Sequence, residues 1–104
     1  MKYYAVAEIR VTDPEWAREY VEKVTPMVEG YGGRYLARTG KVERLEGERE
    51  VPQVFLMVEW PSREVAMAFY ESEEYRPFRE LRVAGSESVF YLVAGEDMTG
   101  AARI

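Results

Sequence analysis

The sequence contains neither cysteine nor histidine in its 104 residues. The absence of cysteine excludes disulfides, thiolate nucleophiles and zinc–thiolate sites. The absence of histidine removes the commonest metal ligand and the commonest general base near neutral pH. Acid–base chemistry in this chain would therefore use Glu, Asp, Tyr, Lys or a bound cofactor. No spacing of carboxylates repeats a metal-binding loop, so we expect no metal site.

Asparagine is also absent and glutamine occurs once, as Gln53, whereas Glu and Arg are plentiful. This bias is typical of thermophile proteins, because amides are heat-labile and ion-pair networks gain value at high temperature. No run approaches the roughly 20 apolar residues of a membrane span, so we expect no membrane partner. The net charge is −5, with acids and bases interspersed and no basic stripe. Nucleic-acid binding is therefore not expected.

A hydrophobic content of 47% and a charged content of 32% are typical of a folded protein. The length favours one domain with a single core, which we place at residues 1–95, followed by a polar tail at residues 96–104. The chain enters a strand pattern within its first residues and shows no signal-peptide pattern, from which we expect a cytoplasmic location.

The first half of the domain reads as a strand followed by a helix. Residues 3–11 are rich in β-branched and aromatic side chains. Asp13 is a good helix cap, and Pro14 suits a first helical turn. Apolar residues then recur at helical spacing up to residue 31, while charged residues take the other face. Pro26 is expected to kink this helix or to restart its last turn.

Residues 32–60 read as a hairpin of two long strands around a polar turn at residues 46–50. Ser62 is placed to cap a second helical region, which breaks near Ser72 and resumes at residue 76. A last strand covers residues 88–94. Both the strand ending at residue 60 and this last strand are continuous apolar runs, which is typical of strands buried on both faces.

The order β-α-β-β-α-β predicts an α+β, ferredoxin-like fold, in which two helices cover one face of a four-stranded antiparallel sheet. The other face would expose an apolar patch larger than soluble monomers usually carry. A second copy packed sheet to sheet around a two-fold axis would bury that patch. We therefore predict a homodimer with a barrel-like core. The alternative is that the tail folds over the free face.

Several segments resemble one known family. They are AEIRVTDPEW, GGRYLARTGKVERLEG, VEWPSREVAMAFYESEEYRPFRELR and a closing strand ending in VAG. Over residues 3–95 the chain resembles domain-of-unknown-function family 1330, of the dimeric α/β barrel superfamily. The resemblance implies the ferredoxin-like fold and a two-fold barrel dimer, and it implies no activity. The wider superfamily includes monooxygenases, lactone isomerases, haem-dependent enzymes and ligand-sensing regulators, and this chain lacks a histidine for a proximal haem ligand.

A cleft between helices and sheet is the natural place for a ligand in this fold. Arginines are fixed bidentate donors that suit a carboxylate or an enolate, and aromatic residues suit an apolar wall. Glu46 or Glu59 is a candidate base if burial raises its pKa. The candidate ligand-binding residues are Arg34, Arg38, Glu46, Trp60, Tyr70, Tyr75, Arg79 and Arg82.

Structural roles compete with each of these assignments. Tyr and Trp at helical or strand spacing are more often core residues. Arg34 and Arg38 can pair with nearby glutamates, and Ser72 suits a helix cap better than a nucleophile, since no histidine is present to activate it.

Three functions remain open from the sequence. The first is a small enzyme, without metal or cofactor, that acts on an apolar carbonyl-bearing or aromatic molecule. The second is a binding or sensing module with the same pocket. The third is a structural homodimer whose aromatic residues are all core. An open cleft favours the first two, and a carboxylate of raised pKa in that cleft favours the enzyme.

Overall fold

The computed structural model describes residues 1–100 and contains one four-stranded sheet with three α-helices. A short 3₁₀ turn, Pro14–Trp16, precedes the first helix. The second helical region is split into two helices, as the break near Ser72 predicted. The elements are β1 (Tyr3–Val11), α1 (Ala17–Gly30), β2 (Arg34–Thr39), β3 (Val54–Trp60), α2 (Arg63–Tyr70), α3 (Arg76–Ala84) and β4 (Ser86–Ala94).

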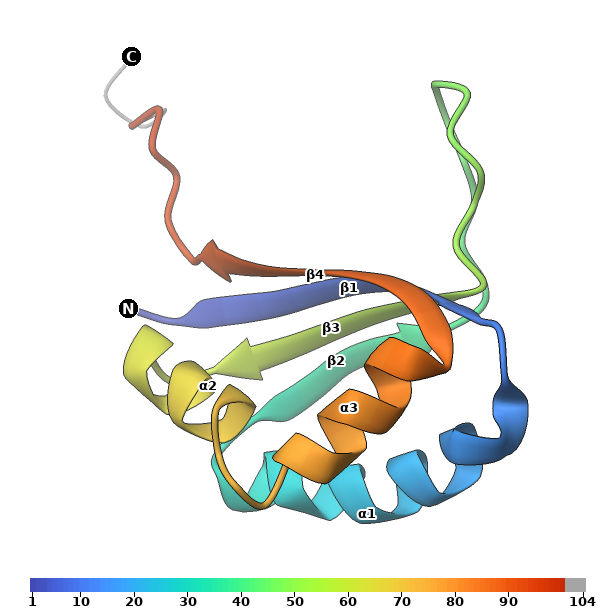
Figure 1. The fold of residues 1–104 in the computed structure, drawn as a ribbon. Helices are drawn as coiled ribbons and strands as arrows, with labels where there is room; N and C mark the ends of the chain where they lie inside the picture. Colours follow the sequence, from blue (N-terminus) through green and yellow to red (C-terminus); the bar gives the residue numbers. More distant parts are fainter. Residues whose placement is uncertain (101–104) are drawn as a thin grey trace.

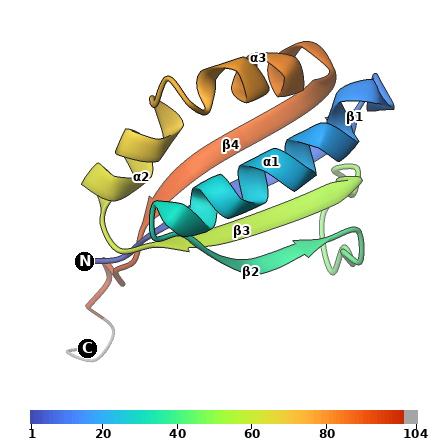
Figure 2. The same cartoon turned by 90° about the horizontal axis from the view of Figure 1, so that it is seen from below.

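All strand pairs are antiparallel and the sheet order is β2-β3-β1-β4, which is the ferredoxin-like arrangement. The helices cover one face of the sheet, and the opposite face carries no helix (Figure 1). Seen from the helical side, α1 lies across the middle of the sheet and α3 lies beside β4 (Figure 2), while α2 contacts β1 and β3. The predicted fold class is therefore confirmed.

The helix starts follow the predicted capping chemistry. The Asp13 carboxylate accepts a hydrogen bond from the Glu15 N–H at 3.1 Å. The Ser62 hydroxyl accepts one from the Val65 N–H at 3.1 Å. Helix α1 continues through Pro26 without restarting. Proline removes only one backbone bond, and buried Val24 and Val28 on either side anchor the helix to the core.

The segment between β2 and β3 differs from the expected hairpin of two long strands. Strand β2 ends at Thr39 and β3 begins at Val54, and residues 40–53 form no strand. This segment, here called the arm, leaves the sheet and projects from its helix-free side (Figure 1). Its composition explains the early end of pairing, because Glu, Gly and Arg crowd its middle and none favours a strand as β-branched residues do.

The core lies between the helices and the sheet. Its buried residues come from α1, β3, α2 and the turn before α3. Their side chains are mainly β-branched or aromatic, as the helical and strand spacing predicted. The buried cluster comprises Val24, Val28, Val58, Trp60, Ala66, Phe69 and Tyr75.

Gly33 is required by close packing between α1 and β3. A Cβ atom there would lie 2.6 Å from Val28 Cγ1 and 2.9 Å from the Trp60 ring. We expect Gly33→Ala to lower the free energy of unfolding by about 1–3 kcal/mol, since two buried side chains must move. Gly30→Ala is the matched control, because nothing lies within 4 Å of that position. Urea denaturation measures both, and equal effects would contradict this account.

The middle of the helix-free face of the sheet is apolar, and Glu8 and Glu59 lie toward its ends. Val6 on β1 lies between Met57 on β3 and Tyr91 on β4, and these side chains share that face. Tyr91 is 59% exposed, and its neighbours Val89 and Val93 are exposed as well. The expectation that β4 is apolar on both faces is therefore confirmed. Over residues 1–100, no helix combines the length and the apolar character needed to cross a lipid bilayer.

Candidate functional site

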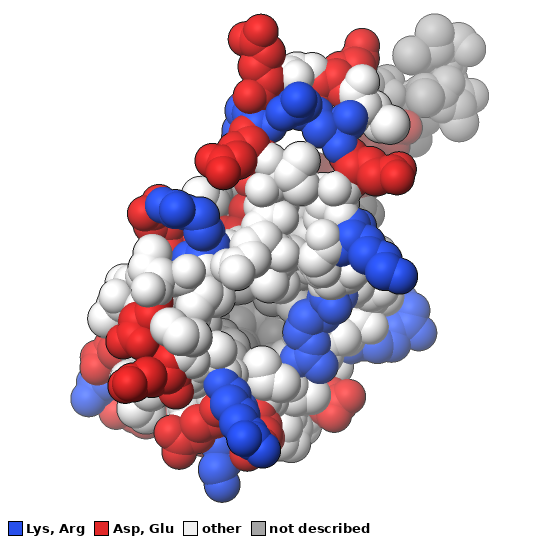
Figure 3. All heavy atoms as spheres, turned by 90° about the vertical axis from the view of Figure 1, so that its right-hand side faces the viewer, with Lys and Arg blue, Asp and Glu red and all other residues white. Residues whose placement is uncertain are grey.

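A cavity of about 630 Å³ lies between the helices and the sheet. This volume is within the range of small-molecule sites, which is roughly 300–1,000 Å³. The lining runs from Trp60 and Phe69 at one end of the sheet to Val11 and Thr39 at the other. Figure 3 views the molecule from the side of the arm and shows the surface hollowed among uncharged residues.

Most of the cavity wall is apolar or aromatic. The Phe69 ring stacks on Tyr75 with centroids 4.4 Å apart and on Trp60 with centroids 5.3 Å apart. Leu56 and Val58 of β3 form part of the floor beside Ala5 of β1. A cavity with this lining favours a flat, apolar molecule, because stacking and burial are the interactions it offers over most of its area.

The hydroxyls of Tyr20 on α1 and Tyr75 before α3 form a hydrogen bond of 2.6 Å. Both residues line the cavity, and Tyr75 is 2% exposed. Burial raises the pKa of Tyr20 well above its usual value, and the adjacent Tyr75 hydroxyl raises it further. Tyr20 therefore stays protonated near neutral pH and acts as a hydrogen-bond donor or acceptor, not as a base.

Arg82 of α3 lies beside this tyrosine pair and is 3% exposed. Its Nη1 donates to the Ser88 hydroxyl at 3.1 Å, and its Cζ lies 4.0 Å from the centre of the Phe90 ring. Its Nε and Nη2 have no hydrogen-bond partner within residues 1–100. Burial lowers the pKa of Arg82, but the Tyr75 and Tyr20 hydroxyls raise it more, so the guanidinium stays charged.

Arg38 on β2 lines another part of the cavity. Its Nη1 donates to the Thr25 hydroxyl at 2.7 Å, and its Cζ lies 4.1 Å from the centre of the Tyr35 ring. Burial raises the pKa of Tyr35, and the charge of Arg38 offsets part of that rise. Arg38 thus has donors to spare, since a guanidinium carries five N–H groups.

The structure brings half of the predicted site residues into the cavity lining. Trp60, Tyr70 and Tyr75 form aromatic wall, and Arg38 supplies charge. Arg82 is not part of the lining, but it contacts the lining residue Phe90. The remaining three, Arg34, Glu46 and Arg79, lie outside the lining.

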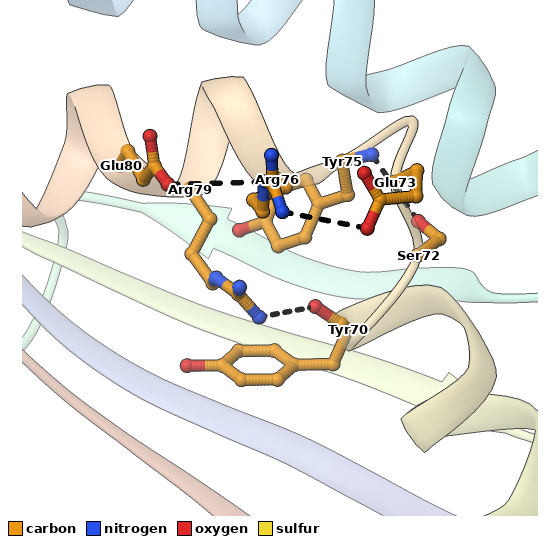
Figure 4. Close-up of polar contacts among 7 residues, drawn as sticks. All are labelled: Tyr70, Ser72, Glu73, Tyr75, Arg76, Arg79 and Glu80. Atoms are coloured by element: carbon orange, nitrogen blue, oxygen red, sulfur yellow. Dashed lines mark hydrogen bonds and ion pairs between the residues drawn. The ribbon is translucent and has the colours of Figure 1, made fainter.

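Arg79 and Arg82 do not form the joint cationic pocket that their spacing suggested. Arg79 Nη1 donates to the Tyr70 carbonyl at 2.6 Å, and its guanidinium lies over the Tyr70 ring (Figure 4). It therefore holds the end of α2 against α3. Ser72 has the predicted capping role, since its hydroxyl accepts from the Tyr75 N–H and donates to the Phe69 carbonyl.

Neither glutamate named as a candidate base faces the cavity. Glu46 is exposed in the arm. Glu59 is paired with Lys2 at 3.0 Å and with Arg34 at 3.3 Å. The hydrogen bond and charge of Lys2, with a smaller contribution from Arg34, lower the pKa of Glu59, which is the opposite of what a base requires. No carboxylate belongs to the cavity lining formed by the described residues.

Sequence reasoning missed Tyr20 as a site residue. Tyr20 belongs to the apolar residues that recur at helical spacing in α1, and that spacing is the same for a core residue and for a residue facing a cavity. The Tyr20 hydroxyl reaches hydrogen-bonding distance of the Tyr75 hydroxyl only because α1 packs close to the turn before α3. Within residues 1–100, no three His, Cys, Asp or Glu side chains gather as a metal site would need.

The model of a family described as "Domain of unknown function (DUF1330)" matches residues 2–96 of this chain. A comparison with curated protein sequences found no match.

Solved structures with the same fold include proteins of known and unknown function. One is a protein of unknown function from Rhodopseudomonas palustris, with a TM-score of 0.77 and 17% identity over 92% of this chain and 83% of that one. Another is SnoaB from Streptomyces nogalater, described as a cofactor-independent oxygenase, with a TM-score of 0.62 and 14% identity over 92% and 94%. A third, described as an antibiotic biosynthesis monooxygenase, has a TM-score of 0.51 and 17% identity over 93% and 100%.

Proposed function

Because this chain belongs to the DUF1330 family, whose description names no activity, we propose a function from the cavity itself. The cavity binds an apolar, carbonyl-bearing or aromatic small molecule and promotes its reaction without a cofactor. The single observation that carries this proposal is the size of the open space, about 630 Å³, inside a domain of this length. A purely structural homodimer would have no use for it, because an unfilled cavity costs stability.

The polar groups of the cavity can stabilise negative charge on a substrate oxygen. The polar groups at the cavity are hydroxyls and guanidinium groups, and preorganised donors of this kind stabilise an enolate as it forms. No carboxylate lines the cavity, so the substrate must be acidic enough to ionise on binding. The description of SnoaB as a cofactor-independent oxygenase supports such a reaction on this fold, as an analogy only.

A neutral fluorescent probe tests the binding step. N-phenyl-1-naphthylamine is expected to bind the wild-type protein with increased emission. Ala5→Phe places a ring in the cavity from the floor of the sheet, and we expect it to weaken binding about tenfold or more, which is about 1.4 kcal/mol. Ala84→Phe is the control, because Ala84 is exposed on α3. Equal affinity in wild type and Ala5→Phe would contradict binding in this cavity.

The catalytic step is tested with anthrone, an apolar ketone that ionises to an enolate. Its enolate reacts with O₂, and the balanced reaction is anthrone plus O₂ giving anthraquinone plus water. The wild type is expected to consume oxygen faster than buffer does, and Ala5→Phe to lose the excess rate. Binding without any excess rate would favour the second candidate, a small-molecule sensor, which the absence of a carboxylate from the described lining also favours.

We also propose that the protein is a homodimer in which two helix-free sheet faces pack together. The exposed Val89, Tyr91 and Val93 supply an apolar face on β4. The arm and the segment after β4 project from that same side and flank the face (Figure 1). Arg49 of the arm reaches Glu8 on the face at 3.5 Å. A second copy would complete the burial that the helices give only to the other face.

A further inference from the structure

The tyrosine pair and Arg82 together form a cluster that has hydrogen-bond donors without acceptors to match. In the Tyr20–Tyr75 bond one hydroxyl donates to the other, which leaves one O–H free. Arg82 uses Nη1 on Ser88 and leaves the N–H groups of Nε and Nη2 unused. Buried donors are normally satisfied. The Tyr20 and Tyr75 oxygens interact with the guanidinium but form no well-aligned hydrogen bond with its Nε or Nη2, so a further acceptor would complete the cluster.

The cluster also carries an uncompensated positive charge. Arg82 is 3% exposed and takes part in none of the ion pairs found within residues 1–100. Its charge meets the Phe90 ring and the two tyrosine hydroxyls there, which are weaker partners than a carboxylate. A buried guanidinium without a counter-ion is costly, and an anionic oxygen beside it would remove much of that cost.

The position of the cluster fits a ligand in the cavity. Tyr20, Tyr75 and Phe90 all line the cavity. The Tyr20 and Tyr75 hydroxyls are hydrogen-bonded to each other, and the Phe90 ring contacts the Arg82 guanidinium. The guanidinium lies near enough to both hydroxyls to affect the pKa of Tyr20. A ligand oxygen at this end of the cavity would accept from the free O–H and lie close to the charge of Arg82, which is outside the lining itself. Its apolar body would lie against Trp60 and Phe69.

We propose that Tyr20, Tyr75 and Arg82 form an anion subsite, and that the natural ligand is an apolar weak acid, an enol or a phenol, bound as its anion. This rests on the proposed function, since it assumes that the cavity takes a ligand. It adds the ligand's chemical class and the residues that select it. Water is the competing occupant of the subsite, and the test below separates the two.

The test uses 4-nitro-1-naphthol, whose anion absorbs visible light, and its methyl ether as a neutral analogue of similar shape. The bound naphthol is titrated by absorbance at saturating protein. We expect its midpoint to lie about one pH unit below that of the free probe, which is a tenfold preference for the anion. The titratable residues of the lining are tyrosine and arginine, which do not ordinarily titrate near neutral pH, so the transition belongs to the probe.

Variants assign the effect to the cluster. Arg82→Met and the double variant Tyr20→Phe with Tyr75→Phe are expected to abolish the shift while they bind the methyl ether as the wild type does. Ether binding also reports that each variant has kept its cavity. Arg76→Met is the matched control, because Arg76 is on the same helix and pairs with Glu73 and Glu80 at the surface (Figure 4). It should leave the shift unchanged.

Each outcome decides one of the two proposals. A bound naphthol that titrates at or above its free midpoint, with normal ether binding, would overturn the anion subsite and leave the apolar cavity standing. A shift that survives in Arg82→Met and in the double tyrosine variant would overturn the assignment to this cluster. Failure of both probes to bind would overturn the proposed function and the subsite with it.

Discussion

Replacing Tyr91 by glutamate is expected to convert the proposed dimer into a monomer at micromolar concentration. Tyr91 is 59% exposed on β4 and lies beside Val6 on the helix-free face. In a sheet-to-sheet dimer a two-fold axis would bring two new carboxylates into the same apolar interface, where an unpaired charge is strongly unfavourable. We expect the dissociation constant to rise by about 100-fold or more, which is about 2.7 kcal/mol.

Sedimentation velocity over a range of concentrations measures this change. Val83→Glu is the matched control, because Val83 is 61% exposed but lies on α3, in the layer away from the proposed interface. It should leave the association unchanged. A wild-type protein that sediments as a monomer at tens of micromolar, or a Tyr91→Glu variant that sediments as the wild type does, would refute the sheet-to-sheet dimer.

Replacing Trp60 by alanine is expected to lower the free energy of unfolding by about 3–5 kcal/mol. Trp60 ends β3, is 3% exposed and stacks on Phe69. The substitution removes the burial of an indole and enlarges the cavity already present beside it. Because the walls of that cavity belong to separate elements of the fold, they are not expected to collapse into the new space. A domain of this size has a total stability of roughly 5–15 kcal/mol, so the variant should be close to unfolding.

Urea denaturation followed by circular dichroism provides the measurement, with Val83→Ala as the control on the exposed face of α3. The control should change the free energy of unfolding by less than about 0.5 kcal/mol. The variant should also bind N-phenyl-1-naphthylamine differently from the wild type if it remains folded, because Trp60 is part of the lining. A Trp60→Ala variant as stable as the control would show that the indole is not an important part of the core.

The fold could be predicted because its determinants are local. Asp13 and Ser62 accept hydrogen bonds from the first turns of their helices whatever the rest of the chain does. Strands β3 and β4 can be recognised in the sequence because each is an apolar run bounded by proline or glycine. The arm was the exception. A polar turn between two runs suggests a hairpin, and how far pairing extends toward the turn depends on cross-strand contacts that the sequence does not specify.

The site was only partly predictable because its residues meet through packing. Arg79 and Arg82 are three residues apart on one helix, yet one donates to the end of α2 and the other is buried beside Phe90. Helical spacing gives the angle between two side chains and not what each one meets. Tyr20 carried no signal beyond its place in an apolar stripe, although its hydroxyl completes the pair with Tyr75.

The sequence by itself determined the order of elements, the apolar character of both faces of β4, and the exclusion of cysteine and histidine chemistry. These follow from composition and from periodicities of two and 3.6 residues, which act over short stretches of chain. The tertiary structure decided that the core contains an open cavity, that no carboxylate among the described residues lines it, and that Arg82 is buried with unused donors. Those properties depend on how closely α1 and α3 approach the sheet, which is a balance of many side-chain contacts from distant parts of the chain.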